Sequence, residues 1–297
     1  MMPAVTLLLL VACAGGASDE SASSDDSGGT VSSPCRGDLP PESVEVVAAG
    51  LVEGTEGLAF LDGALYVSTP TGVLRVAPEG TVEGVWENDH ALGLAAVGSA
   101  LWVADPGEFS FGGDTDGELW SLNPTGQATL LSSGWSNPNF LAATPWGTVL
   151  LSDDTQESVW ELQADGTGAV WLDGVPSPNG IVVTEEAVTV ASTFVEDGAV
   201  YRAPVTDGVA GAPALLATTV AGGANDGLAL GEDGSVWVAV NLAGELWRID
   251  PDGVASRFVH DLDSPASLAF GQGQDWDPCS LYVTSLFGEE VVRVVVE

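Results

Sequence analysis

Positive charge is what this sequence most lacks. It contains no lysine, and six arginines face 43 acidic residues over 297 positions, which gives a formal net charge of −37 at pH 7. Such an excess repels phosphate groups, so we expect neither nucleic acids nor anionic membrane surfaces as partners. A strongly hydrated, soluble exterior accounts for the acidity without pointing to any particular substrate. We expect a monomer.

Histidine and cysteine are also scarce. The chain has two histidines, His90 and His260, and three cysteines. Because protein zinc sites are built mainly from these two residue types, zinc is not the metal that this composition favours.

A hydrophobic run long enough to span a bilayer is missing. Residues 4–12 are apolar but too short, and small and acidic residues follow them at once. This pattern predicts an export signal over residues 1–12, and Leu10-Val11-Ala12-Cys13 resembles a bacterial lipobox, although no basic residue precedes the run. We expect Cys13 to be lipidated as the first mature residue of a periplasmic or cell-surface lipoprotein, with an ordinary cleaved signal as the alternative. Residues 13–40 are then a flexible tether rich in Ser, Asp and Gly.

The two remaining cysteines, Cys35 and Cys279, lie at opposite ends of the rest of the chain. An exported protein meets an oxidising compartment, so these two residues are a candidate disulfide. The chain-entropy model gives a loop of this length roughly 5 kcal/mol of stabilisation. Two buried free thiols are the alternative.

What the sequence has in abundance is repetition. Six short apolar segments recur 36 to 47 residues apart, at 57–60, 93–96, 140–143, 180–183, 227–230 and 267–270. The second residue of each range is a leucine or isoleucine that opens the apolar strand. A second apolar segment follows each one, at 64–68, 100–104, 148–152, 187–191, 235–239 and 280–284, and a third at 73–76, 118–121, 158–161, 199–202, 245–248 and 290–293. Turn residues such as those at 123–126 and 250–253 follow most of the third segments.

A fourth segment, such as 129–131 or 169–172, is present in five of the repeats, but the sixth repeat stops at Glu297. Residues 44–48 have the strand pattern and would complete the sixth repeat from the other end of the chain. Four strands per repeat at this period predict an all-β fold, a six-bladed β-propeller over residues 41–297. The recurring tryptophans of the second and third segments are expected to pack between blades: Trp102, Trp120, Trp160, Trp237 and Trp247.

One position stands two residues before each opening leucine or isoleucine. It carries a side-chain oxygen in four repeats, as Glu56, Asn139, Asn179 and Asp226, and none in the other two, as Leu92 and Ala266. If the repeats surround an axis, the four oxygens converge at one mouth of the central channel. Two carboxylates and two amide carbonyls suit one divalent cation, with calcium favoured. The alternative is that Asn179-Gly180 and Asp226-Gly227 only form turns.

These residues also carry a family resemblance. Four motifs in order resemble the SMP-30/gluconolactonase-like family of six-bladed propellers, with paraoxonases as distant relatives: Glu56-Gly57, Asn137-Pro138-Asn139, Pro178-Asn179-Gly180-Ile181 and Asn225-Asp226-Gly227-Leu228. The resemblance covers about residues 44–297. It implies a divalent-metal site, often for calcium, and hydrolysis of lactones, with Glu56, Asn179 and Asp226 as metal ligands and Asn139 beside metal and substrate.

Two positions depart from the family's pattern. Where some members have an arginine that orients a sugar acid, this chain has Asn137, and where an acidic residue is common, it has Phe140. The metal ligands are therefore retained while the sugar-acid contacts are not. Phe109 and Phe111, in the insertion 108–116, are further candidates for contact with an apolar substrate.

The leading hypothesis is a calcium-dependent lactonase or esterase acting on a small molecule. The cation would polarise the carbonyl while Asp226 assists the attack of water. His90 is a minor candidate for a base, since a lone histidine is more often a loop residue. The alternative is a non-catalytic propeller lipoprotein that uses its metal as a brace and binds a partner.

Overall fold

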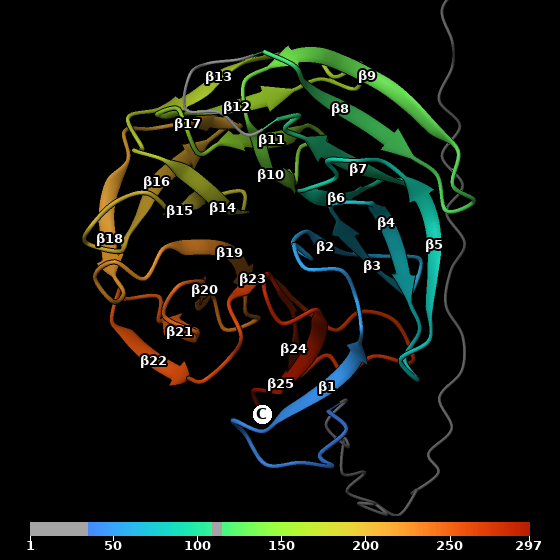
Figure 1. The fold of residues 1–297 in the computed structure, drawn as a ribbon. Helices are drawn as coiled ribbons and strands as arrows, with labels where there is room; N and C mark the ends of the chain where they lie inside the picture. The colour runs from blue at the N-terminus through green and yellow to red at the C-terminus, as the bar shows by residue number, and fades with distance from the viewer. Residues whose placement is uncertain (1–34, 109–114) are drawn as a thin grey trace, which may run out of the picture. The chain divides into compact units, whose positions relative to one another are not determined.

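The computed structural model describes residues 35–108 and 115–297, and over these residues it contains strands and no helix. Six sheets stand around a central axis as the blades of a propeller, so the predicted fold is confirmed (Figure 1). No helix in this part of the chain is long and apolar enough to cross a membrane. The predicted export signal and Cys13 lie outside the described residues.

The blades follow one another along the chain, each with its first strand innermost. Blade 1 consists of β2 (Leu58–Leu61), β3 (Ala64–Thr69), β4 (Gly72–Val76) and β5 (Val82–Glu87). Blade 2 consists of β6 (Leu94–Val97), β7 (Ala100–Asp105), β8 (Gly117–Leu122) and β9 (Ala128–Trp135). Blade 3 consists of β10 (Pro138–Ala143), β11 (Val149–Asp153), β12 (Ser158–Leu162) and β13 (Gly168–Asp173). Blade 4 consists of β14 (Pro178–Val183), β15 (Ala187–Ser192), β16 (Ala199–Thr206), β17 (Val209–Ala210) and β18 (Ala214–Thr218). Blade 5 consists of β19 (Asn225–Leu230), β20 (Val236–Val240), β21 (Glu245–Ile249) and β22 (Ala255–Val259). Blade 6 consists of β23 (Pro265–Phe270), β24 (Ser280–Ser285), β25 (Glu290–Val295) and the N-terminal strand β1 (Val44–Ala49).

Blade 4 has one strand more than the predicted four. Its third strand, β16, is eight residues long: the first half pairs with β18 and the second half with β17. The extra strand is a two-residue hairpin arm, and the four-stranded plan of the blade is otherwise kept.

The N-terminal strand closes the ring as predicted. β1 is the outer strand of blade 6 and pairs antiparallel with β25, so that Val44 stands opposite Val294 and Glu45 opposite Arg293. The first and last strands of the propeller thus share one sheet, which leaves the ring no open end.

The core of the protein lies between the blades. Six clusters of buried apolar side chains each join two neighbouring blades, including one that joins blade 6 to blade 1 through Tyr282 and Leu65. Trp102 and Trp237 belong to these clusters, and Trp120, Trp160 and Trp247 pack against them. The tryptophans therefore serve blade packing, as predicted.

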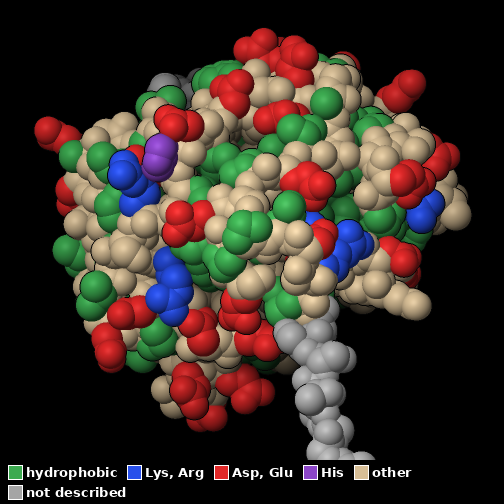
Figure 2. All heavy atoms as spheres, turned by 90° about the horizontal axis from the view of Figure 1, so that it is seen from below, with side chains coloured by type: hydrophobic (Ala, Val, Ile, Leu, Met, Phe, Trp, Pro, Cys, Tyr) green, Lys and Arg blue, Asp and Glu red, His purple; other side chains and the backbone are tan. Residues whose placement is uncertain are grey.

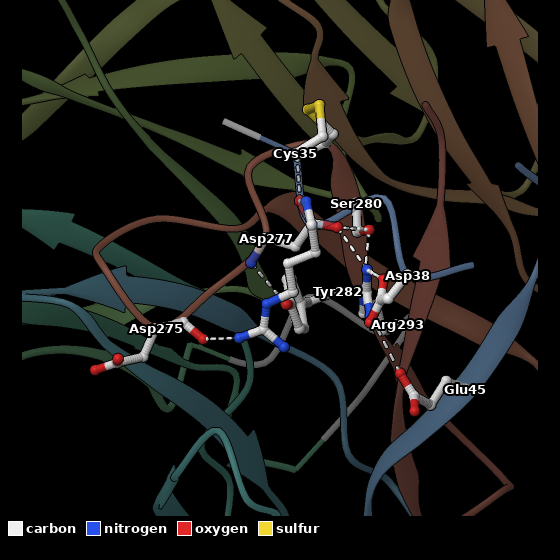
Figure 3. A network of polar contacts seen from close by, with 10 residues as sticks. Cys35, Asp38, Glu45, Asp275, Asp277, Ser280, Tyr282 and Arg293 are labelled. Atoms are coloured by element: carbon white, nitrogen blue, oxygen red, sulfur yellow. Dashed lines mark hydrogen bonds and ion pairs between the residues drawn. A yellow bond between two sulfur atoms is a disulfide. The ribbon is translucent and has the colours of Figure 1, made fainter. Parts of the chain in front are cut away.

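A disulfide and a buried arginine secure the closing blade (Figure 3). Cys35 is bonded to Cys279 with a Cα–Cα distance of 5.2 Å, so the predicted pairing is confirmed. Arg293, which is 2% exposed, contacts Asp277 at 2.6 Å and Asp38 at 2.7 Å. Its guanidinium lowers the pKa of Asp38 to about 2. Cys35 and Asp38 of the predicted tether are thus attached to the propeller.

Candidate metal centre

The inner strands of blades 3, 4 and 5 begin with β-bulges, and three of the predicted ligands lie in these bulges. In blade 4 the register of pairing between β14 and β15 shifts between Pro178 and Ile181, so that two residues of β14 lie opposite a single residue of β15. Asn179 lies in that bulge, and Asn139 and Asp226 have the same place in β10 and β19. A bulge re-aims side chains that would otherwise alternate across the sheet. All three side chains are buried.

Glu56, the fourth predicted ligand, lies two residues before β2, where blades 6 and 1 meet. Its backbone N–H donates to the carbonyl of Ser68 in β3 at 3.1 Å, and its own carbonyl accepts a hydrogen bond from the hydroxyl of Thr284 in β24. The residue is partly buried. The backbone of Glu56 is therefore held by one strand of blade 1 and one strand of blade 6.

The glycines that follow the ligand positions allow neighbouring blades to approach closely. A Cβ at Gly93 would lie 1.9 Å from the backbone oxygen of Asn139, and one at Gly180 would lie 2.3 Å from that of Asp226. Asn179-Gly180 and Asp226-Gly227 lie within β14 and β19 and not in tight turns. The turn alternative is therefore wrong: these glycines leave room for the next blade's ligand strand.

Two residues that the sequence analysis missed join the predicted ligands. Asp154 directly follows β11, and its Oδ2 accepts a hydrogen bond from Nδ2 of Asn139 at 3.1 Å. Asn241 directly follows β20, and its Nδ2 donates to Oδ2 of Asp226 at 3.5 Å. The second strand of a blade runs antiparallel to the first, so its end lies beside the start of the inner strand. A polar residue after the second strand was the signal available in the sequence.

Three carboxylates influence one another here. Burial and then the charge of Asp154 raise the pKa of Glu56 to about 7. Burial and then the charge of Asp153 raise the pKa of Asp154 to about 7. For Asp226, burial followed by the charges of Glu56 and Asp154 raises the pKa well above its usual range, although hydrogen bonds from Asn179 and Asn241 oppose the shift. No positive side chain among the described residues contributes to these shifts, so burial and neighbouring acids disfavour the charged form of all three carboxyl groups.

The oxygens that lack partners fit a hard cation. Oδ1 of Asp154 and Oδ1 of Asn179 are buried and have no hydrogen-bond partner among the described residues. A buried polar atom without a partner costs free energy, and carboxylate and amide oxygens are the donors that calcium prefers. The two unpartnered oxygens, on Asp154 and Asn179, are therefore of the type that fits a divalent cation.

The three carboxylates are arranged loosely. Within residues 35–108 and 115–297, no three acidic side chains bring one oxygen each within 4.8 Å of one another. Cys35, Cys279 and Glu297 do approach that closely, but both sulfurs are in the disulfide and offer no thiolate to a metal.

The other predicted site residues lie as follows. The backbone N–H of His90 donates to Oδ1 of Asn88 at 2.8 Å. The amide of Asn137 donates from Nδ2 to the hydroxyl of Thr155 at 3.1 Å. Phe140 packs at the edge of the apolar cluster between blades 3 and 4. Phe109 and Phe111 lie outside the described residues.

A cavity of about 490 Å³ lies elsewhere, between blades 5 and 6. It is lined by the β19–β20 turn, including Leu230 and Asp233, and by Phe270 at the far end of β23. These residues are at the opposite ends of the inner strands from Asp226 and Ala266. The cavity is therefore separate from the candidate metal centre.

Residues 154–287 match the model of the SMP-30/gluconolactonase/LRE-like region. This segment is SMP-30/gluconolactonase-like. It includes Asn179 and Asp226 with their motifs, so the resemblance seen in the sequence is confirmed there. No curated protein matches the chain.

Solved structures share the architecture at low sequence identity. A gluconolactonase from Xanthomonas campestris has a TM-score of 0.72 and 18% identity, covering 89% of this chain and 97% of its own. A calcium-binding regucalcin from Agrobacterium tumefaciens has a TM-score of 0.68 and 17% identity, covering 86% and 95%. An aldose sugar dehydrogenase from Streptomyces coelicolor, bound to PQQ, also scores 0.68 at 16% identity, covering 87% and 100%. Enzymes of different chemistry share this fold, so the fold alone does not decide the activity.

Proposed function

We propose that the protein is a divalent-cation-dependent hydrolase of lactones or esters, with calcium as the cation. The observation that carries the proposal is the concentration of buried, uncompensated oxygen donors at the start of the inner strands, above all the unpartnered Oδ1 of Asn179 beside Asp226. The family resemblance supports it, and so do the relatives described as a gluconolactonase and a calcium-binding regucalcin.

Glu56, Asn139, Asn179 and Asp226 would hold the cation, which supplies Lewis-acid polarisation of the substrate carbonyl. Asp226, whose carboxylate lies beside the proposed cation, is the leading candidate to accept the proton of the attacking water. Water adds to the carbonyl carbon, the ester C–O bond breaks, and the proton passes to the departing oxygen. His90 is the second candidate for the base.

The substrate that this site favours is electrically neutral. All six positive side chains of the protein are arginines, and none of them is on an innermost strand. Figure 2, which shows the side of the propeller and not the mouth of its channel, has acidic side chains spread over it and basic side chains at a few places. Because Glu56, Asp154 and Asp226 would repel an anionic substrate, we propose a neutral lactone or ester. Phe140, Asn137 and the predicted Phe109 and Phe111 are the candidates for contact with its body.

A binding protein braced by its metal is the second candidate function. Two contacts favour it: the side-chain amide of Asn137 donates a hydrogen bond to Thr155 of the same blade, and Phe140 packs against an apolar cluster. Neither residue replaces the sugar-acid contacts that the family resemblance implies. In this role the cation would stabilise the ring and the rim would bind a partner.

Metal analysis of the purified protein, combined with a panel of aliphatic lactones and aryl esters with and without chelator, separates the two functions. We expect bound calcium and hydrolysis that chelation abolishes and calcium restores. Asp226→Asn should abolish turnover, and unchanged activity would exclude Asp226 from the mechanism. Bound metal without hydrolysis of any substrate would favour the binding protein.

Export and a lipid anchor at Cys13 are part of the same proposal. The Cys35–Cys279 disulfide supports an oxidising compartment. Labelling cells with a fatty-acid analogue should mark the wild-type protein and leave Cys13→Ser unmarked. Equal labelling of both would contradict the anchor.

A further inference from the structure

Asp154 has one oxygen in use and one without a partner. The residue is 6% exposed and directly follows β11, the strand that pairs with β10. Its Oδ2 accepts the hydrogen bond from Nδ2 of Asn139 at 3.1 Å, whereas its Oδ1 is buried with no hydrogen-bond partner in the described part of the chain. A carboxylate used only to position Asn139 would not need a second oxygen buried in this way.

The surroundings of Asp154 add negative charge and no positive charge. Glu56 and Asp226 both repel it, and they come from blades 1 and 5. Asp153, its neighbour in the chain, is satisfied locally, since its oxygens accept hydrogen bonds from the backbone N–H groups of Asn137 and Thr155. Asp154 therefore differs from the adjacent acid: a bound cation is the partner that its chemistry lacks.

We propose that Asp154 is a fifth protein ligand of the cation, and that the donor set of this chain consists of three carboxylates and two amides. This inference rests on the metal site proposed above. The hydrogen bond to Asp154 uses Nδ2 of Asn139, so Oδ1 is the amide atom of Asn139 that would bind the same ion. Three carboxylates carry one charge more than a divalent cation neutralises, so the site should accept trivalent lanthanides well.

In the described part of the chain the three carboxylates do not bring one oxygen each within 4.8 Å of one another. Like charges hold one another apart, and a cation among them removes that repulsion. The proposal therefore includes an inward movement of the Glu56, Asp154 and Asp226 carboxylates when a cation binds.

The test is terbium luminescence of the full chain, which counts the water molecules on the bound ion from lifetimes in H2O and D2O and measures calcium affinity by competition. Asp154→Asn keeps the shape of the side chain and the hydrogen bond from Asn139 but loses the charge. The matched control is Asp105→Asn, which removes a buried carboxylate at the same end of blade 2, where Asn88 and the N–H of Gly107 already satisfy it.

We expect Asp154→Asn to weaken calcium binding at least about tenfold and to admit one more water to the bound terbium. Asp105→Asn should change neither quantity. Weaker binding with an unchanged water count would overturn the ligand assignment, because Asp154 would then act only by positioning Asn139. Unchanged affinity would overturn it as well. If the wild-type chain binds neither ion, the proposed metal site fails together with this inference. Asp154→Ser repeats the comparison should Asp154→Asn not fold.

Discussion

Gly180 of blade 4 lies so close to Asp226 of blade 5 that a Cβ at position 180 would be 2.3 Å from the backbone oxygen of Asp226. Alanine at this position must push the two blades apart at the candidate metal centre. We expect Gly180→Ala to lower the free energy of unfolding by about 1–3 kcal/mol, the usual effect of overpacking. Calcium affinity should fall with it, because Asn179 and Asp226 would no longer keep their spacing. Chemical denaturation and a calcium titration measure the two effects.

Gly84 of β5 provides the control for that substitution. A Cβ at Gly84 would meet no atom within 4 Å. Gly84→Ala should therefore leave calcium binding unchanged and stability unchanged or slightly raised. Equal losses in both variants would show that the approach of the two blades is not the cause.

The buried carboxylates predict a pH dependence of stability. In the folded protein the pKa of Glu56 and Asp154 is raised to about 7, from ordinary values of 4.5 and 3.8. Between those values the folded state holds more protons than the unfolded chain, so the stability of the metal-free protein falls as pH rises from about 4 to about 7. A cation binds the deprotonated groups, and its stabilising effect should grow over the same window.

Thermal unfolding with chelator or with calcium, at about pH 5 and about pH 8, checks this linkage. The comparison at each pH cancels the contribution of acids far from the site. The increase in melting temperature on adding calcium should be larger at the higher pH. An increase that is the same at both values would contradict the coupling between the carboxylates and the cation.

Arg293 should be one of the most important side chains for stability. It is 2% exposed, and its partner Asp277 is 1% exposed. Arg293→Ala leaves the Asp277 carboxylate buried without its cation, which should cost about 3–5 kcal/mol in unfolding free energy. Arg257→Ala removes an ion pair with Glu245 in which the arginine side chain is 53% exposed, and should cost less than about 1 kcal/mol. Similar losses in both variants would refute the special role of the buried pair.

The Cys35–Cys279 disulfide should stabilise the closing blade. It links residues 244 positions apart in the sequence. Replacing both cysteines by serine should lower the unfolding free energy by about 2–5 kcal/mol. Reducing the disulfide of the wild-type protein should lower it by a similar amount. A double variant as stable as the wild type in denaturant would contradict this prediction.

The fold could be predicted because its signals are local and repeated. Each inner strand is marked by a leucine or isoleucine, which follows a glycine or serine in every repeat except the third, where it follows Phe140. The closing strand at residues 44–48 is found because the sixth repeat lacks its fourth strand. The disulfide follows from having two cysteines left over. The added strand β17 could not be foreseen, since two residues carry no periodicity.

The candidate site was predictable only in part. The position two residues before each opening leucine or isoleucine pointed to Asn139, Asn179 and Asp226, but the β-bulges that hold them leave no mark in a pattern of alternating residues. Asp154 was missed because Asp153-Asp154 looks like an ordinary acidic turn in a chain with 43 acidic residues. Only the structure distinguishes Asp153, which is satisfied by hydrogen bonds, from Asp154, which retains an unpartnered oxygen.

Titration calorimetry of calcium into chelator-treated protein tests the central claim most directly, with Asp226→Asn as the comparison. The account predicts that the wild-type chain binds a single ion and that the variant, which loses one carboxylate of the donor set, binds it at least about tenfold more weakly. A wild-type protein that binds no calcium, or a variant that binds it equally well, would contradict a cation site built on Asp226.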